Sequence, residues 1–376
     1  MKFIISRNAL FYNLSAISGV ISSNNSLAIL DHFLFTIKDS KLFLMASDMD
    51  TTMTSVIELD NVEGEGCVAV PSKILLETLK LIPETPIVFA IDQEKNIFKF
   101  QAANGEYDAP CKNGDEFPRP KEIENAQYFD IPASVMHRAI SKTLFATGSD
   151  ELRPTMMGVF CELSEEGISF VATDAHKLVR YVNNTIKNDE YVSFILPKKP
   201  LSHLKSILPG VTEDIHVTYS KETNHICFNF SNLTLYSSLK EGKYPNYEAV
   251  IPKENNNQLT ISREEFLKSI RRVGIYSNQS TYQIRISMAE AQTTITGEDM
   301  DESNKAEENI ACEYVGEPME IGFNSKFLSE MLGNIDTAQV RMDLSEPKRA
   351  ALLFPVEEED VQQESLLMLL MPVMLN

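Results

Sequence analysis

The sequence predicts an α+β protein made of three tandem copies of one domain, each with two helices and antiparallel sheets. Three observations support this prediction. Four landmark segments recur along the 376-residue chain at intervals of about 126 residues. Each copy contains two stretches with helical periodicity. Between them lie short segments of alternating apolar and polar residues, typical of strands that are covered by helices on one face.

The landmarks keep the same order in every copy. The first is a strand-and-helix segment, FIISRNALFYNLSAISGVI in the first copy, which begins at Phe3, Phe129 and Leu259. The second, CVAVPSKILLETLKLIP in the first copy, begins at Cys67, Ser193 and Met319. The third is the turn ASDMD, ATDAH or GEDMD, beginning at Ala46, Ala172 and Gly297. The last is a residue followed by proline, at Phe117, Tyr244 and Met371. We therefore predict domains at 1–125, 126–254 and 255–376, joined by polar linkers at 121–127 and 252–258.

Each copy opens with a short strand and then a helix that has an apolar stripe. In the first copy Leu10, Leu14, Ile17 and Ile21 recur at i, i+4, i+7 and i+11. A second helix follows later in each copy, and proline ends it in the first two. The predicted helices cover residues 7–19, 72–81, 133–145, 198–207, 262–275 and 325–333. Strands such as KLFLMAS and GISFVAT complete each unit.

The chain ends on the apolar segment ESLLMLLMPVMLN, residues 364–376. Its apolar part is far shorter than the roughly 20 residues that a membrane-spanning helix needs. Pro372 would also interrupt a helix there. The opening MKFIISRNALFYN turns polar at once, unlike a secretion signal. We expect no membrane segment, and a tail that is the buried final strand of the third copy.

Composition narrows the possible functions. The formal charge of −20 favours solubility and, taken over the whole chain, argues against a nucleic-acid partner. The five cysteines are scattered and form no CxxC pair, so neither a disulfide framework nor a zinc site is indicated. We expect reduced thiols, a cytoplasmic location, and no metal or other cofactor.

The basic residues are unevenly placed. The six predicted helices carry thirteen of the 34 basic residues but only four of the 54 acidic ones. If these helices face the same way, an acidic protein presents one basic surface that contacts phosphates without sequence preference. The alternative is that lysine and arginine are simply good helix formers, although glutamate is equally good and is scarce here. The residues predicted to face DNA are Arg7, Lys73, Lys80, Arg138, Lys142, Lys198, Lys199, Lys205, Lys268, Arg271 and Arg272.

A metal-dependent enzyme is the alternative function. The turn TDAH places Asp174 beside His176, and the equivalent turns carry the pairs Asp48/Asp50 and Asp299/Asp301. These turns occupy equivalent positions in separate domains, so they need not converge, and aspartate in such turns usually bonds nearby backbone groups. The sequence contains no GxxxxGK[ST] or GxSxG motif. A binding protein without catalytic activity is therefore favoured.

The whole chain resembles the bacterial DNA polymerase III beta subunit family, the sliding clamps. The resemblance is carried by MKF at the start, VATDAHKL (171–178), EGKYPNYEAVIPK (241–253), MEIGFNSKFL (319–328) and MPVML (371–375). It implies the DNA clamp fold, with two subunits joined head to tail in a ring of six domains whose helices line the hole. Such a ring encircles duplex DNA topologically and acts as a polymerase processivity factor.

The resemblance also implies two sites. In the family, short peptides from the replicative polymerase, the clamp loader and repair proteins bind a cleft between the second and third domains. Carried over by motif, its lining comprises Met156, Thr173, Ala175, His176, Lys177, Leu178, Pro245, Val250, Asn324, Phe327, Leu369, Met371, Pro372, Val373 and Met374. Methionines suit a surface that accepts varied apolar peptides, although core packing is the alternative for Met371 and Met374.

The second implied site is the dimer interface, formed by Tyr107 and Ala109 of one subunit and Ile275 and Tyr276 of the other. An acidic run within residues 299–308 is either a charge partner across this seam or a solvated loop.

Departures from the family pattern also carry expectations. The family's common TDGHR is TDAHK here, so Ala175 narrows the backbone approach and Lys177 lacks a planar guanidinium. Thr281 stands where an aromatic is often found, and the loop SSNN (22–25) has no basic residue. We therefore expect the preference for peptides and the contact with DNA to differ from those of relatives.

Overall fold

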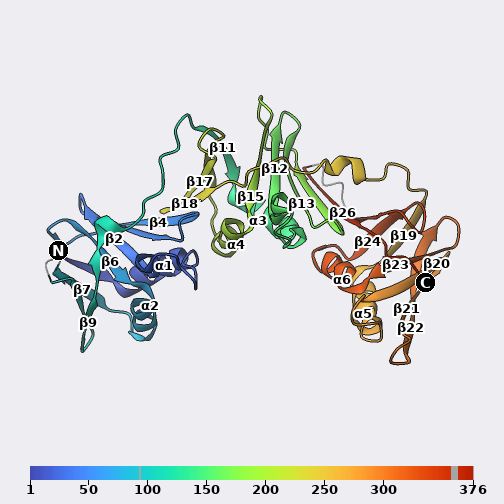
Figure 1. The fold of residues 1–376 in the computed structure, drawn as a ribbon, viewed down its shortest axis with the longest axis horizontal. Coiled ribbons are helices and arrows are strands. Elements are labelled where there is room, and N and C mark those ends of the chain that lie inside the picture. Colours follow the sequence, from blue (N-terminus) through green and yellow to red (C-terminus); the bar gives the residue numbers. More distant parts are fainter. Residues whose placement is uncertain (93–94, 357–362, 376) are drawn as a thin grey trace. The chain divides into compact units, whose positions relative to one another are not determined.

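The computed structural model describes residues 1–92, 95–356 and 363–375, so the last residue of the predicted tail lies outside the described part (Figure 1). The chain forms two compact units. The first contains Met1–His137 and Lys199–Leu239, and the second contains Arg138–Lys198 and Lys240–Asn376. The middle repeat thus contributes strands to both units.

The first compact unit holds two antiparallel sheets. The smaller has the order β5-β1-β7-β8-β9. Its strands are β1 (Lys2–Ser6), β5 (Val62–Glu63), β7 (Pro86–Asp92), β8 (Ile97–Ala102) and β9 (Gly105–Pro110). The larger has the order β10-β6-β2-β3-β4-β18-β17-β16-β11. Its strands are β2 (His32–Lys38), β3 (Lys41–Ser47), β4 (Thr51–Glu58), β6 (Gly66–Pro71), β10 (Lys112–Asn113), β11 (Gln127–Pro132), β16 (Asp214–Ser220), β17 (His225–Phe230) and β18 (Leu233–Ser238).

The second compact unit holds one sheet of twelve strands, in the order β15-β12-β13-β14-β26-β25-β24-β19-β22-β21-β20-β23. The strands from the middle repeat are β12 (Gly158–Ser164), β13 (Gly167–Thr173), β14 (Lys177–Asn183) and β15 (Val192–Pro197). Those from the third repeat are β19 (Asn257–Ser262), β20 (Gln283–Ala289), β21 (Gln292–Asp299), β22 (Asn304–Val315), β23 (Met319–Asn324), β24 (Gln339–Leu344), β25 (Ala351–Val356) and β26 (Glu364–Leu370).

The six predicted helices are confirmed among the described residues. They are α1 (Arg7–Ser18), α2 (Ser72–Leu81), α3 (Ala133–Thr143), α4 (Lys198–Ile207), α5 (Arg263–Gly274) and α6 (Ser325–Gly333). The predicted apolar stripe of α1 is fully buried at Leu10, Leu14 and Ile17, whereas Ile21 lies beyond the end of the helix. α6 begins after Asn324, whose side chain accepts hydrogen bonds from the next turn and caps the helix.

Strand pairs join successive repeats. β4 of the first repeat pairs with β18 of the second, with Met53 opposite Leu235. β14 of the second repeat pairs with β26 of the third, with Leu178 opposite Leu369. β26 is the buried final strand that the tail was predicted to form, and Leu370 at its end is fully buried. The repeats are therefore tied together by continuous backbone hydrogen bonding rather than by side-chain contacts alone.

Candidate peptide-binding site and basic helices

The turn at residues 173–177 forms the base of the candidate peptide site. Asp174 Oδ1 accepts hydrogen bonds from the backbone N–H groups of His176 and Lys177, each at 2.9 Å. Asp48 and Asp299 make the same kind of bond to backbone groups two and three residues further on. The three aspartates thus hold equivalent turns, as predicted, and no cluster of His, Cys, Asp or Glu in the described residues could hold a metal ion.

Ala175 adopts a left-handed backbone conformation in this turn, with φ of 75°. Its N–H donates to Thr173 Oγ1 at 3.1 Å, and that hydroxyl donates to the carbonyl of Lys177 at 2.7 Å. The geometry is one that glycine adopts without penalty and alanine does not. The turn with Ala175 is therefore intact but strained.

Lys177 cannot reach out to a ligand as a free cation. Its side chain is 6% exposed, and its Nζ lies 2.9 Å from Asp174 Oδ2 and 3.0 Å from Glu330 Oε2. The same ammonium lies 4.7 Å from the centre of the Phe327 ring, on which the His176 ring also stacks at 5.7 Å. Burial alone would lower the pKa of Lys177, but the bonds to the two carboxylates raise it above its ordinary value. Lys177 therefore remains charged and fixes Phe327 in place.

The tail crosses from this turn to strand β23. Met371 N–H donates to the carbonyl of His176 at 2.9 Å, and Val373 N–H donates to the carbonyl of Gly322 at 2.9 Å. A Cβ at Gly322 would lie only 2.6 Å from the carbonyl oxygen of Val373, so glycine permits this close approach. Met371 is 41% and Met374 is 62% exposed. The tail is thus held by its backbone, and its methionine side chains are presented to solvent.

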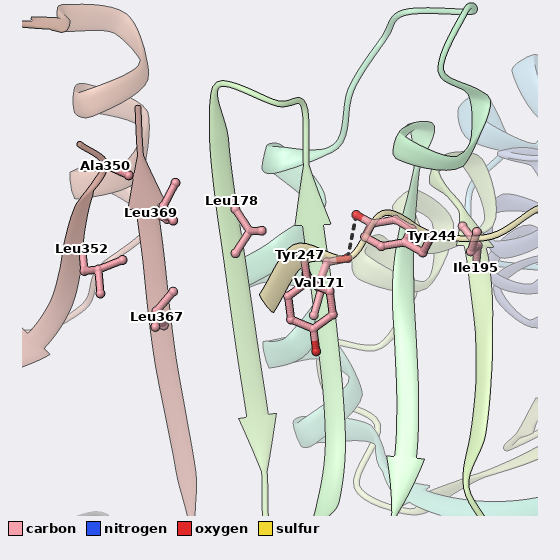
Figure 2. Close-up of a cluster of buried hydrophobic side chains, with 9 residues drawn as sticks. All are labelled: Val171, Leu178, Ile195, Tyr244, Tyr247, Ala350, Leu352, Leu367 and Leu369. Atoms are coloured by element: carbon pink, nitrogen blue, oxygen red, sulfur yellow. Dashed lines mark hydrogen bonds between the residues drawn. The ribbon is translucent and has the colours of Figure 1, made fainter. Parts of the chain in front are cut away.

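A buried cluster supports the tail strand from one face of the sheet (Figure 2). Leu178 and Leu369, which face each other across β14 and β26, are each 2% exposed. Tyr244 joins the cluster and donates its hydroxyl to the carbonyl of Val171 at 3.3 Å. Val250, at the end of a 3-10 helix beside the cluster, is 54% exposed.

The fifteen residues predicted to line the cleft all belong to the second compact unit and divide into two groups. Exposed or half-buried are Met156, Ala175, His176, Pro245, Val250, Asn324, Phe327, Met371, Pro372, Val373 and Met374. Almost fully buried are Thr173, Lys177, Leu178 and Leu369. Hydrogen bonds and ion pairs hold the side chains of Thr173 and Lys177, and Leu178 and Leu369 pack in the apolar cluster, so the role of these four in the cleft stays a prediction.

Two contributors, Glu330 and Gly322, were absent from the predicted lining. Glu330 is the only acidic residue in its helix. Its contact with Lys177 joins residues that are far apart in the sequence, so no local pattern indicates it. Gly322 stands inside a strand, a position that often marks a close backbone approach. The glycine inside a predicted strand is the one sequence feature that could have indicated Gly322.

One predicted DNA-facing residue is wrongly assigned. Lys142 is 5% exposed, and its Nζ lies 2.7 Å from Asp336 Oδ2 and 2.7 Å from the carbonyl of Asn334. Arg138 shares Asp336 at 3.1 Å and binds Glu364 at 2.6 Å. Lys142 therefore stabilises the packing of α3 in this unit and does not face solvent.

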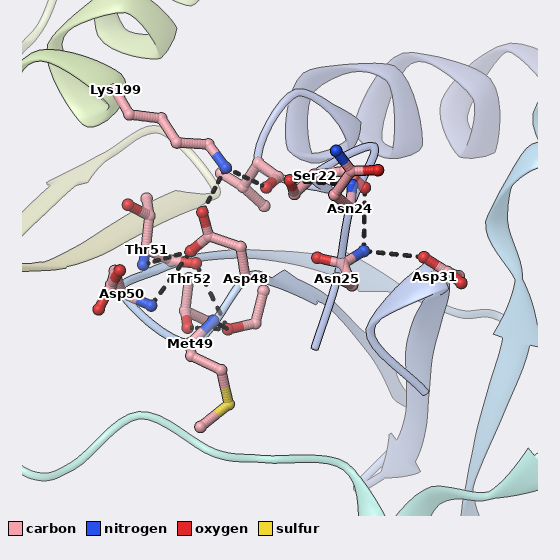
Figure 3. Close-up of polar contacts among 12 residues, drawn as sticks. Ser22, Asn24, Asn25, Asp31, Asp48, Met49, Asp50, Thr51, Thr52 and Lys199 are labelled. Carbon is pink, nitrogen blue, oxygen red and sulfur yellow. Dashed lines mark hydrogen bonds and ion pairs between the residues drawn. The ribbon is translucent and has the colours of Figure 1, made fainter. Parts of the chain in front are cut away.

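Other helix cations are tied to partners. Arg7 donates from Nε to the carbonyl of Leu79 at 2.6 Å, at the end of α2. Lys199 binds the Asp48 carboxylate and donates to the carbonyl of Val20 at 2.9 Å (Figure 3). Two further cations, on α5, are paired with carboxylates: Lys268 with Glu264 and Arg272 with Glu308.

Four of the predicted cations are exposed and make no ion pair with another described residue. They are Lys73, Lys80, Lys205 and Arg271. Lys198 is also exposed. Contact of these side chains with phosphate stays a prediction.

The residues predicted for the dimer interface lie near exposed apolar surface. Tyr107 is 38% exposed and lines a groove of about 660 Å³ with Ile74 and Leu81, which is 85% exposed. Ile275 and Tyr276 are 70% and 45% exposed. Ala109 is half-buried in β9.

The three-repeat architecture, the basic helices and the turn-and-tail site define a clamp-type binding protein. Three family models match residues 1–121, 130–246 and 248–369, described as the N-terminal, central and C-terminal domains of the DNA polymerase III beta subunit. The chain therefore belongs to the DNA polymerase III beta subunit family, the beta sliding clamps. It is a DNA polymerase processivity factor, an accessory subunit without catalytic activity.

Relatives match over almost the whole chain. The beta sliding clamp of Pseudomonas putida is 27% identical over 96% of this chain and 97% of its own. That of Vibrio cholerae is 24% identical over 100% of both chains. A crystal structure of the Pseudomonas aeruginosa sliding clamp covers 100% of both chains with 26% identity and a TM-score of 0.93. Among the described residues, no helix has both the length and the apolar character to cross a membrane.

Proposed function

We propose that two copies of this chain close head to tail into a ring that encircles duplex DNA. The proposal is supported by the match to beta sliding clamps along the chain and by apolar surface at Tyr107 and Ile275. In a ring that closes after two copies, the surface at Tyr107 of each copy is buried against the surface at Ile275 of the other. It would act in the cytoplasm, and we retain residues 125 and 254 as the proposed domain limits.

Contact with DNA is proposed to be weak and independent of sequence. Within the described part of the chain, exposed cations such as Lys73, Lys205 and Arg271 make no ion pair, whereas Lys199 and Arg272 are paired with carboxylates. When few cations contact phosphates, few counterions are released, and the affinity for the DNA backbone is low. Topology, rather than affinity, then keeps the protein on DNA while it slides.

The test of the ring compares circular and linear DNA. A clamp loader from a relative would load the protein on nicked circular duplex, and gel filtration would separate bound from free protein. We expect retention on the circle and release when one restriction cut linearises it, because the ring slides off the ends. Equal retention after cutting, with the ends left free, would contradict the topological mechanism.

We propose that short peptides of the replicative polymerase, the clamp loader and repair proteins bind over the turn, α6 and the tail. The observation that carries this proposal is the exposure of Met371 and Met374 on a tail whose backbone is hydrogen-bonded at Met371 and Val373. Exposed thioethers on a rigid support can adapt to different apolar side chains without losing their position. His176 and Phe327 add a stacked aromatic surface beside them.

Deleting residues 371–376 tests this assignment. We expect loss of peptide binding in calorimetry with an unchanged dimer mass by light scattering. A milder variant, Met371→Ser with Met374→Ser, should weaken binding about tenfold or more, because roughly one buried apolar side chain's worth of transfer free energy is lost. Met49→Ser is the control, since Met49 is 55% exposed but lies in the first compact unit. Unchanged peptide affinity in the double variant would refute the site.

A further inference from the structure

A second surface, a polar groove of about 600 Å³, lies on the third repeat over strands β20 to β23. Arg285, Thr296 and Glu320 line it. They alternate along their strands with fully buried residues such as Ile286. On the opposite face helix α5 is so close that a Cβ at Gly297 would lie 2.5 Å from the carbonyl of Val273 in that helix. The groove is therefore on the sheet face opposite α5.

In the first repeat the corresponding face is covered by the chain itself. Leu34 and Ala69 face each other across β2 and β6 and are buried under Phe117. Phe117 belongs to the residue-and-proline landmark that closes this repeat.

The second repeat repeats this arrangement. Phe160 and Ile195 form the cross-strand pair, and Tyr244 covers them with its ring stacked on Phe160 at 4.7 Å. Tyr244 again belongs to the closing landmark.

The third repeat breaks the pattern. About 126 residues further on, the cross-strand pair is Arg285 and Gly322. Here the tail covers Gly322, through the bond from Val373, and Leu375 reaches the rim of the groove. The polar part of the face, over Arg285 and Thr296, is left uncovered. A closing segment pairs with the strand of Gly322 or its equivalent in all three repeats, but only in the first two does its aromatic side chain cover the neighbouring residue, and in the third Arg285 stays exposed.

The charge of the groove indicates what would fill it. Its lining includes five carboxylates and two cations. Asp299 is used by its own turn, but Glu298 and Glu320 are exposed. Arg285 lies 3.6 Å from Glu320, and setting this pair aside leaves four carboxylates and one cation, Lys305, in the lining. The surplus of negative charge favours basic side chains and repels acidic ones.

The groove is continuous with the proposed peptide site. Asn324, which caps α6, donates from Nδ2 to the carbonyl of Thr281 at 3.0 Å, and Thr281 lines the groove. Asn324 also faces Gln283, another lining residue, across β23 and β20. A peptide seated on the methionines of the tail would need only a short extension past Leu375 to enter it.

We propose that this groove binds the segment flanking the apolar core of a partner peptide, and that it selects lysine and arginine in that segment. The inference rests on the peptide site proposed above. It adds a specificity element: affinity among partners is ranked by the charge next to the apolar core as well as by the core itself.

The experiment uses the full-length protein and synthetic peptides with one apolar core. The core is tested alone, and then extended at either end by four residues that are either Lys-Arg rich or Ser-Gly. By calorimetry at low salt, we expect the basic extension at one end to improve affinity about fivefold over the Ser-Gly extension, since exposed charge contacts are individually modest. The improvement should fall as salt rises.

Variants locate the effect. Glu298→Gln with Glu320→Gln should abolish the improvement while the core peptide binds as before. Glu290→Gln with Glu313→Gln makes the same charge change at exposed positions outside the groove and should leave the improvement intact.

Each other outcome overturns the proposal. Equal affinity for basic and Ser-Gly extensions would exclude selection by charge. A gain that persists in the groove variant would place the basic contact elsewhere. Loss of dimer mass in the groove variant would assign this face to a second copy of the chain. If the core peptide does not bind at all, the proposed peptide site is refuted. This outcome differs from those that refute the groove alone, because in those the core peptide still binds.

Discussion

Replacing Ala175 by glycine should stabilise the second compact unit. Ala175 has φ of 75°, where an L-residue pays about 1 to 2 kcal/mol, and its exposed methyl group contributes little packing. Glycine removes that strain but adds about 0.4 to 1 kcal/mol of entropy to the unfolded chain. The net expectation is a gain of about 1 kcal/mol.

Thermal unfolding monitored by circular dichroism is the assay. For a unit of this size, a gain of about 1 kcal/mol corresponds to a rise in Tm of roughly 2 to 4 °C. The amides of His176 and Lys177, which both donate to Asp174, should also exchange hydrogen more slowly. Both readouts report on the turn itself.

The control is Ala249→Gly. Ala249 is an exposed alanine of the same unit, in a 3-10 helix and without positive φ. There, glycine relieves no strain and should lower stability by about 0.5 to 1 kcal/mol. If Ala175→Gly lowers Tm as Ala249→Gly does, the strain argument is wrong.

Two further predictions concern charge. Burial raises the pKa of Asp336, but the larger combined effect of Lys142 and Arg138 is to lower it, so the net shift of this pKa is downward. The ionised carboxylate of Asp336 therefore stabilises the fold above about pH 4, and this stabilisation is lost as pH falls below that value. Asp336→Asn should therefore reduce Tm at pH 7, and the difference from the parent protein should narrow below about pH 4; a constant difference would contradict the linkage. For DNA, Lys205→Ala should reduce the slope of log affinity against log salt on short duplexes by about 0.9, whereas Lys199→Ala should change it less because Lys199 is paired. Equal effects of the two substitutions would refute the ranking by ion pairing.

Local patterns predicted the elements well because their causes are local. The stripe of Leu10, Leu14 and Ile17 needs only helical periodicity, and it is buried as expected. The aspartate turns likewise depend on bonds to groups two or three residues away, as at Asp174. Comparison among the three copies strengthened each of these predictions.

Long-range pairing explains what the sequence did not reveal. Lys142 looks like any helix cation until it meets Asp336, which is 194 residues away. Leu178 and Leu369 are apolar in any arrangement, and they are buried because the pairing of β14 with β26 brings them into one apolar cluster with Tyr244 and Tyr247. No local pattern encodes such partners.

Comparison of the three repeats also identifies positions at which the third repeat differs from the first two. Phe117 and Tyr244 close the first two repeats as buried aromatic residues, with 2% and 5% exposure. Met371, at the equivalent position of the third repeat, is 41% exposed and follows a strand paired with the preceding repeat. Leu375, in the same tail, lines the groove, so the proposed peptide site and the proposed basic-segment site adjoin.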